Sequence, residues 1–183
     1  MRSSPLTGLA IFLLAIALSA CVVYPTTRTY FEPDPSDGKL VPSTSCGYYS
    51  TRNDALARDL PGFHVQVSPQ FEQGKAFMLT VLFRTPQGGI VVTADQFELR
   101  SSNDGLSHKP VDIKTNLYTP DKSPPYYSRW VHLKFLPLSE QLDQITFVFP
   151  QGSVLVNGHA VELAPFRFRK VERQDVYYAS INC

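Results

Sequence analysis

Hydrophobic and polar residues alternate through most of the chain after Gly62, a pattern typical of half-buried β-strands. Segment 129–138 is the clearest example, with one face made of Val131, Leu133 and Phe135 and the other of Trp130, His132 and Lys134. The same reasoning predicts further strands at 63–68, 110–118 and 144–150. The chain closes with two more strand-like segments, 166–171 and 175–182.

Three local features refine this pattern. Residues 75–84 are apolar on both faces, which indicates a central strand covered on two sides. Asn157-Gly158 lies between two alternating runs and predicts a two-residue type I′ hairpin, because both turn residues need a positive φ. Between Ala94 and Phe97 the alternation slips, as a β-bulge would cause.

Residues 50–60 are the exception and predict one short helix near the start of the domain. Ser50 or Thr51 can cap it, and Pro61-Gly62 would end it. Its interior would consist of the helix-favouring residues Ala55, Leu56, Ala57 and Leu60.

The spacing of these elements predicts the fold class. About nine short strands with turn signals every 8–12 residues indicate an all-β antiparallel β-sandwich, of immunoglobulin-like type. The main alternative is a closed β-barrel of lipocalin type. No repeat of 20–50 residues is visible, which argues against a propeller or a solenoid.

The N-terminal residues have the layout of a secretory signal peptide. Arg2 supplies a positive start, Leu9 to Leu18 form an apolar run, and Ser19 and Ala20 are small. The polar stretch from Tyr24 onwards ends the run before it reaches the roughly 20 apolar residues of a membrane span.

Leu18-Ser19-Ala20-Cys21 resembles the lipobox of bacterial lipoproteins, in which a dedicated peptidase cleaves just before a lipidated cysteine. The resemblance covers residues 1–21 and implies that Cys21 becomes the mature N-terminus and carries acyl chains such as palmitate. Two or more chains hold a protein stably on a membrane, whereas one does so marginally. In this family Asp after the cysteine favours the inner membrane, so Val22 implies the outer membrane, facing the periplasm.

The expected domain organisation follows from these segments. Residues 1–20 are the signal peptide, 21–45 the lipidated N-terminus with a flexible tether, and 46–183 the sandwich domain. The tether is inferred from the Pro, Ser, Thr and Asp content of 22–45, although "TRTYF" within it is also compatible with an edge strand.

The charge balance argues against nucleic-acid binding. Cleavage after residue 20 removes Arg2, so the 17 basic residues become 16 and equal the 16 acidic ones. The nearest thing to a basic patch is interrupted by Glu172 and Asp175, and it consists of Arg167, Arg169, Lys170 and Arg173. With 43% hydrophobic residues the chain is expected to be globular.

The three cysteines divide into one plus two. With Cys21 lipidated, Cys46 and Cys183 are an even pair in an oxidising compartment, and we expect them to form a disulfide. In the chain-entropy model so long a loop is worth about 5 kcal/mol at most. The alternative, two free or metal-binding thiols, is weakened by the lack of a CxxC spacing.

No catalytic motif is present, and no cofactor is expected. GxSxG, HExxH and phosphate-binding glycine loops are all missing from the sequence. His64 and His132 could meet across a sheet as metal ligands, but surface or structural histidines are commoner. Asp54 and Asp59 are interpreted as solvated charges on the predicted helix, and Asn103-Asp104-Gly105 as a plain turn.

One aromatic stretch, 118–130, is the candidate for contact with a partner. Its anchors would be Tyr118, Tyr126, Tyr127 and Trp130, which supply stiff amphipathic area on a loop stiffened by prolines. The alternative is that these side chains fold back onto the edge of the sandwich.

The sequence therefore predicts a membrane-anchored periplasmic lipoprotein that acts by protein–protein or envelope contact rather than by catalysis. Two alternatives stay open. One is an inhibitor or immunity protein against a periplasmic toxin or enzyme, and the other is an envelope enzyme whose site the sequence does not reveal.

Overall fold

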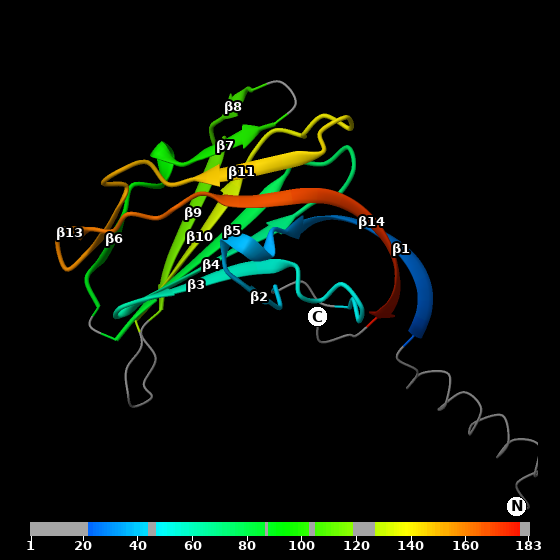
Figure 1. Ribbon diagram of the computed structural model, residues 1–183, viewed down its shortest axis with the longest axis horizontal. Helices are drawn as coiled ribbons and strands as arrows, with labels where there is room; N and C mark the ends of the chain where they lie inside the picture. The colour runs from blue at the N-terminus through cyan, green and yellow to red at the C-terminus, as the bar shows by residue number, and fades with distance from the viewer. Residues whose placement is uncertain (1–21, 44–46, 87, 103–104, 119–126, 180–183) are drawn as a thin grey trace, which may run out of the picture.

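The computed structural model describes residues 22–43, 47–86, 88–102, 105–118 and 127–179, which form two facing antiparallel sheets and a small third one (Figure 1). The five-stranded sheet has the order β1-β14-β11-β7-β8. Its strands are β1 (Val22–Pro33), β14 (Phe166–Ala179), β11 (Gln144–Val148), β7 (Glu98–Ser101) and β8 (Ser107–His108).

The six-stranded sheet has the order β2-β3-β4-β5-β10-β9. Its strands are β2 (Lys39–Val41), β3 (Ala55–Leu60), β4 (Phe63–Gln70), β5 (Met78–Thr85), β10 (Tyr127–Lys134) and β9 (Asp112–Tyr118). As the sequence indicated, β5 is central, since it pairs with β4 on one side and β10 on the other.

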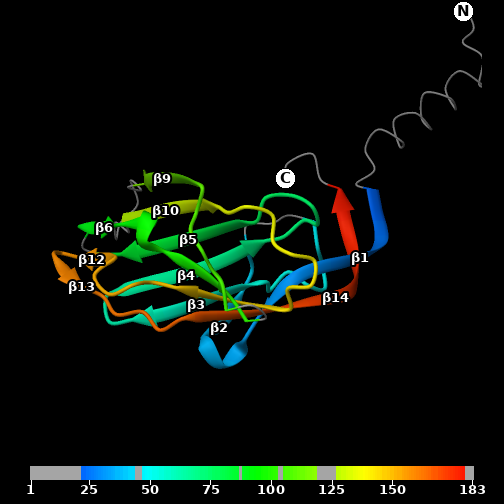
Figure 2. The ribbon, with the colours of Figure 1, turned by 90° about the horizontal axis from the view of Figure 1, so that it is seen from above.

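The third sheet, β13-β12-β6, lies at one end of the molecule (Figure 2). It is made of β6 (Ile90–Val92), β12 (Val154–Val156) and β13 (His159–Ala160). The predicted Asn157-Gly158 turn joins β12 to β13, and the φ angles of 52° and 81° at these residues confirm it.

The space between the two large sheets is filled by apolar side chains from the inward positions of the strands. Phe149 is the hub of this core, because its ring meets those of Phe83, Phe97, Phe147 and Phe166 at centroid distances of 4.7–6.0 Å. The prediction of an antiparallel β-sandwich is confirmed, and the sheets are not closed into a barrel. The immunoglobulin-like type stays a prediction.

The predicted helix at 50–60 was wrong, because residues 55–60 form strand β3. Leu56 is fully buried in the core opposite Val67, and Ala55 and Ala57 are buried on the other side of the strand. Pairing with β2 and β4 on both sides satisfies the backbone of β3, and this tertiary environment overrides the helix preference of Ala and Leu.

The expectation of a flexible tether was also wrong for the part of 21–45 that the structure describes. Residues 22–33 are β1, and a one-turn 3₁₀ helix, η1 (Pro35–Asp37), leads into β2. The alternative placement of "TRTYF" in an edge strand is confirmed, since Thr27–Phe31 lie within β1 at the edge of its sheet. An edge position tolerates Pro25 and Pro33, which lack an N–H to donate.

The predicted bulge between Ala94 and Phe97 is instead a second 3₁₀ turn, η2 (Ala94–Gln96). It carries the chain from β6 in the third sheet to β7 in the five-stranded sheet. The slip in alternation therefore marks a change of sheet rather than an irregularity within one strand.

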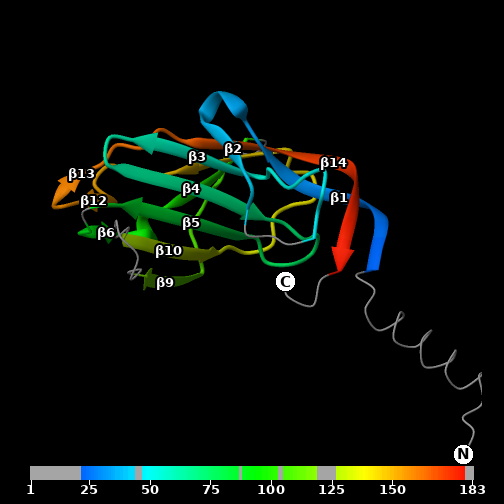
Figure 3. The same cartoon turned by 90° about the horizontal axis from the view of Figure 1, so that it is seen from below.

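Beyond the sandwich, β1 and β14 continue together as a curved two-stranded ribbon (Figure 1). We call this ribbon the arm: residues 22–29 of β1 paired with 172–179 of β14, from Val22 opposite Ala179 to Thr29 opposite Glu172. The arm and the third sheet lie at opposite ends of the molecule (Figure 3).

Candidate functional site

Both described ends of the predicted contact stretch 118–130 belong to strands. Tyr118 is the last residue of β9, and Tyr127 and Trp130 belong to β10. Tyr126 lies outside the described residues.

Trp130 lies on the outer face of the six-stranded sheet, as the alternation indicated. Its ring is parallel to that of His132, with an interplanar angle of 6° and a centroid distance of 6.3 Å. Its cross-strand neighbour Leu82 is only 2% exposed although it lies outside the core cluster. Trp130 thus has a packing role beside Leu82 and remains half-exposed itself.

Tyr127 is also half-buried. A Cβ added at Gly88 would lie 3.2 Å from the Tyr127 ring, so Gly88 packs closely against it. The two described aromatic side chains of the predicted site therefore combine packing with partial exposure.

The two histidines singled out in the sequence do not come together in register. His64 lies opposite Arg84, whereas His132 lies opposite Thr80. His64 Nδ1 is 2.6 Å from Asp59 Oδ1, and His132 Nδ1 is 3.1 Å from Thr80 Oγ1. Across the described residues no group of three His, Cys, Asp or Glu side chains is arranged to hold a metal ion.

Asp54 and Asp59 do not share a helix surface, which corrects their interpretation as a pair of solvated charges. Asp59 is exposed on β3, but Asp54 is 1% exposed and forms an ion pair with Arg28. A buried charge pair at this place was not anticipated, because its two members are brought together by the pairing of β1 that the sequence analysis missed.

Arg28 joins the arm to the segment that precedes β3. Its guanidinium donates to the carbonyl and the hydroxyl of Thr51 at 2.7 and 2.8 Å, and also to Asp54 Oδ2. The guanidinium lies over two tyrosine rings, 4.1 Å from the centroid of Tyr48 and 4.7 Å from that of Tyr30. Arg28 is thus fixed by charge, hydrogen bonds and ring contacts at once.

Asp175 fixes the same segment from the other strand of the arm. Its carboxylate accepts hydrogen bonds from the backbone amides of Tyr49, Ser50 and Thr51 at 2.8–3.1 Å and from the Thr51 hydroxyl. Burial alone would raise the pKa of Asp175, but the bonds from the Thr51 hydroxyl and the backbone amides outweigh it and hold the pKa well below its ordinary value.

Residues 47–51 lie along the outer part of β14, on the side opposite β1. Tyr178 donates its amide to Gly47 O at 2.6 Å, and Tyr49 donates to Val176 O at 3.2 Å. Gly47 has φ of 101°, and a Cβ there would lie 2.4 Å from the Tyr177 ring, so only glycine fits this close approach.

The tip of the arm is a cluster of five tyrosines, which we call the tyrosine tip. Tyr177 contacts Tyr24 and Tyr48 at centroid distances of 5.4 and 5.1 Å, and Tyr49 contacts Tyr178 at 6.2 Å. Three of the rings are exposed to a large extent: Tyr49 by 61%, Tyr24 by 44% and Tyr178 by 39%. The cluster cannot be read from the sequence, because Tyr24 and Tyr49 reach Tyr177 and Tyr178 only through tertiary pairing.

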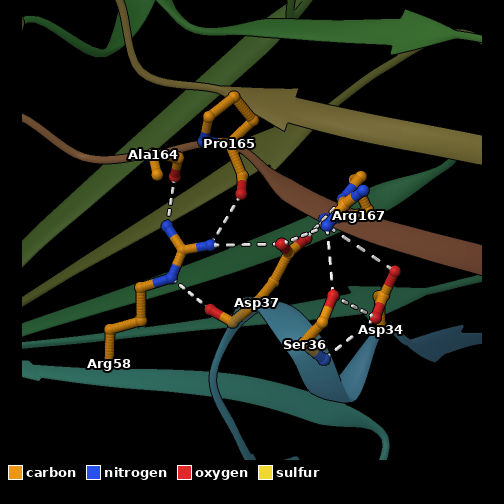
Figure 4. A network of polar contacts seen from close by, with 7 residues as sticks. All are labelled: Asp34, Ser36, Asp37, Arg58, Ala164, Pro165 and Arg167. Atoms are coloured by element: carbon orange, nitrogen blue, oxygen red, sulfur yellow. Dashed lines mark hydrogen bonds and ion pairs between the residues drawn. The ribbon is translucent and has the colours of Figure 1, made fainter.

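A cluster of charged residues away from the arm joins η1 to both large sheets (Figure 4). Arg167 donates to Asp37 Oδ1 at 2.7 Å and Oδ2 at 2.9 Å, and these bonds lower the pKa of Asp37 from its ordinary value. Arg58 on β3 donates to three backbone oxygens, those of Asp37, Ala164 and Pro165, while its guanidinium lies 3.9 Å from the Phe166 ring centroid. These charges are paired, so the cluster is explained as a structural clamp.

Beside this clamp runs a groove of about 380 Å³ on the five-stranded sheet. It is lined by the paired charges Glu32, Asp34, Arg167 and Arg169 together with Gln144 and Thr146. The arrangement lacks a nucleophile beside a base and offers no group poised for proton transfer among its lining residues.

Comparison with known proteins adds no relative. The chain matches no family model, no curated protein and no solved structure. Within the described part of the chain, none of the helices is long and apolar enough to cross a membrane.

Proposed function

We propose that this chain is a lipoprotein of the bacterial cell envelope, anchored through Cys21 in the outer membrane and facing the periplasm, that works by binding another protein. The main support for this anchor is the sequence Leu18-Ser19-Ala20-Cys21 at the end of an apolar run.

Replacement of the anchor cysteine tests this proposal. Cys21→Ser is expected to abolish acyl labelling and block cleavage of residues 1–20, because the peptidase acts on the lipidated cysteine. Cys46→Ser is the matched control and should leave both unchanged. Mass spectrometry that finds an intact residue 1 or an unmodified Cys21 in the native protein would contradict the anchor.

We propose that the partner binds to the β9–β10 edge, which we define as residues 112–118 of β9 with Tyr127 and Trp130 of β10. β9 is the outermost described strand of its sheet, so the backbone groups that face away from β10 are open to pairing with an added strand. Beside it, Trp130 offers a half-exposed aromatic anchor and Leu117 is 61% exposed.

The charges on β9 restrict this partner. Lys114 is exposed in the middle of the strand, where a lysine discourages pairing between identical edges. A partner strand with an acidic residue opposite Lys114 and a basic residue opposite Asp112 would be favoured.

Photo-crosslinking from single positions tests the β9–β10 edge. A crosslinking residue at exposed Asn116 is expected to capture one defined envelope protein, and one at exposed Val91, in the third sheet, is not. Leu117→Glu should reduce the capture with little change in Tm, because Leu117 is mainly solvated. Equal capture from both positions, or none from Asn116, would contradict the proposed surface, and capture of a hydrolase would favour an inhibitor role.

The disulfide between Cys46 and Cys183 also stays a proposal, because both residues lie outside the described part of the chain. It is supported by the hydrogen bond between Gly47, which follows Cys46, and Tyr178, which lies near Cys183 in sequence. Non-reducing peptide mapping should recover the two cysteine peptides joined. Free thiols at both positions in protein taken from the periplasm would contradict it.

A further inference from the structure

The chain between the proposed anchor and the folded structure has no spare length. β1 begins at Val22, directly after Cys21, and is paired with β14 from its first residue. Since a strand rises about 3.4 Å per residue, Tyr24 lies within about 10 Å of Cys21 along the chain. The tip of the arm is therefore the part of the domain that must be nearest to the lipid.

The tyrosine tip is unlike the rest of the arm in charge. Residues 22–27, 47–51 and 176–179 contain no Asp, Glu, Lys or Arg. Their exposed apolar area comes from Val23, Tyr24, Tyr49 and Tyr178. The first exposed charges along the arm, Glu172 and Arg173, come only farther from the tip.

Tyrosine suits the boundary between lipid and water, because its ring is apolar while its hydroxyl remains hydrated, and it is enriched at that boundary. The exposed rings come from three segments, β1, 47–51 and β14, which Arg28 and Asp175 hold together. Little ordering entropy would be lost when such a stiff frame settles on a surface.

We infer that the tyrosine tip lies in the headgroup layer of the membrane that holds Cys21, so that the arm stands between lipid and sandwich and sets the orientation of the domain. This inference rests on the proposed anchor. It assigns a lipid surface to the tip and leaves the third sheet, at the opposite end of the molecule, facing away from the membrane.

The sole tryptophan of the chain allows a direct test with the full lipidated protein in phosphatidylethanolamine and phosphatidylglycerol vesicles. In a Trp130→Phe background, single tryptophans are placed by Tyr49→Trp or Tyr24→Trp at the tip and by Val91→Trp in the third sheet. Lipids brominated near the glycerol end of the acyl chain should reduce tip emission roughly twofold and leave Val91→Trp nearly unchanged. Circular dichroism and Tm establish that each variant is folded.

Two different failures can be told apart. If the protein floats with the vesicles but both tip tryptophans stay unquenched, the inference is overturned and the anchor stands. If the full-length protein does not float with the vesicles at all, the proposed anchor is wrong, and the inference that rests on it is wrong too. Equal quenching at Val91→Trp would also overturn it, because the domain would then have no fixed orientation.

Discussion

The sandwich body and the arm are held together by different chemistry. In the body, the buried cluster between the sheets consists of aliphatic and phenylalanine side chains, none of which titrates. In the arm, Arg28 and Asp175 are buried and satisfied by hydrogen bonds, Arg28 to Asp54 and Asp175 to Thr51. The stability that apolar packing supplies does not depend on pH, and such a core unfolds cooperatively. The stability that a charged network supplies changes when one of its groups gains a proton, and the segment that it holds can open locally.

The largest effect is expected in the body. Phe149→Ala removes the ring that meets four other phenylalanines and should lower the free energy of unfolding by about 4 kcal/mol. Urea denaturation followed by circular dichroism measures it. The control Leu106→Ala removes an exposed side chain and should cost less than about 0.5 kcal/mol. A similar small loss for Phe149→Ala would mean that the core collapses around the gap.

The next largest effect is expected in the arm and not in the body. Asp175→Ala leaves the backbone amides of Tyr49, Ser50 and Thr51 and the buried Thr51 hydroxyl without their acceptor, which should favour opening of the arm by about 3 kcal/mol. Hydrogen exchange should accelerate at 22–29 and 172–179 and change little in β4 and β5.

The matched control for the arm is Asp95→Ala, which changes an exposed aspartate in η2 and should leave exchange unaltered. If Asp175→Ala accelerates exchange in β4 and β5 as much as in the arm, the two regions unfold as one unit and the comparison fails.

A smaller effect is expected from pH. Because the folded-state pKa of Asp175 lies below its ordinary value of about 3.9, the stability that its carboxylate supplies is complete above roughly pH 4 to 5 and declines as the pH falls below that. The difference in arm protection between the native protein and Asp175→Asn should therefore narrow between about pH 5 and pH 3. A constant difference would show that the charge of Asp175 is not what stabilises the arm.

The smallest effect concerns a turn of the third sheet. Asn157 has φ of 52°, a left-handed conformation that asparagine tolerates better than alanine, so Asn157→Ala should cost about 1 kcal/mol. Asn157→Gly should be nearly neutral, and thermal unfolding of the two variants measures the contrast. An equal loss for both would point to the side chain of Asn157 rather than to its backbone angle.

Local sequence signals predicted the body well and the arm poorly. The alternation of 129–138 and the Asn157-Gly158 turn depend on neighbouring residues, so the pattern contains the information. Val22–Pro33 was expected to be a tether because its partner strand lies at the far end of the chain, and nothing local reveals that pairing. Residues 55–57 were missed for a related reason, since burial between β2 and β4 decides their conformation.

The candidate surfaces also differ in how far the sequence predicted them. The alternation put Trp130 on the face opposite Val131, and its half-exposed side chain lies on the outer face of the six-stranded sheet. The tyrosine tip was not predicted from the sequence, because Tyr24 reaches Tyr177 only when β1 pairs with β14, and Tyr49 reaches Tyr178 only when residues 47–49 lie along β14. The burial of Arg28, Asp54 and Asp175 was not predicted for the same physical reason: charged residues are buried only where distant segments satisfy them.

The pairing of β1 with β14 also determines when the arm can form during synthesis of the chain. β1 is the first described strand to leave the ribosome and β14 the last, so the arm cannot form until nearly the whole chain has been made. Until then β1 is an unpaired strand with two open edges, and closing so long a loop is slow compared with forming the β4–β5 pair. The beginning of the chain therefore stays unpaired until its end has been made, which makes the timing of synthesis part of how this fold is reached.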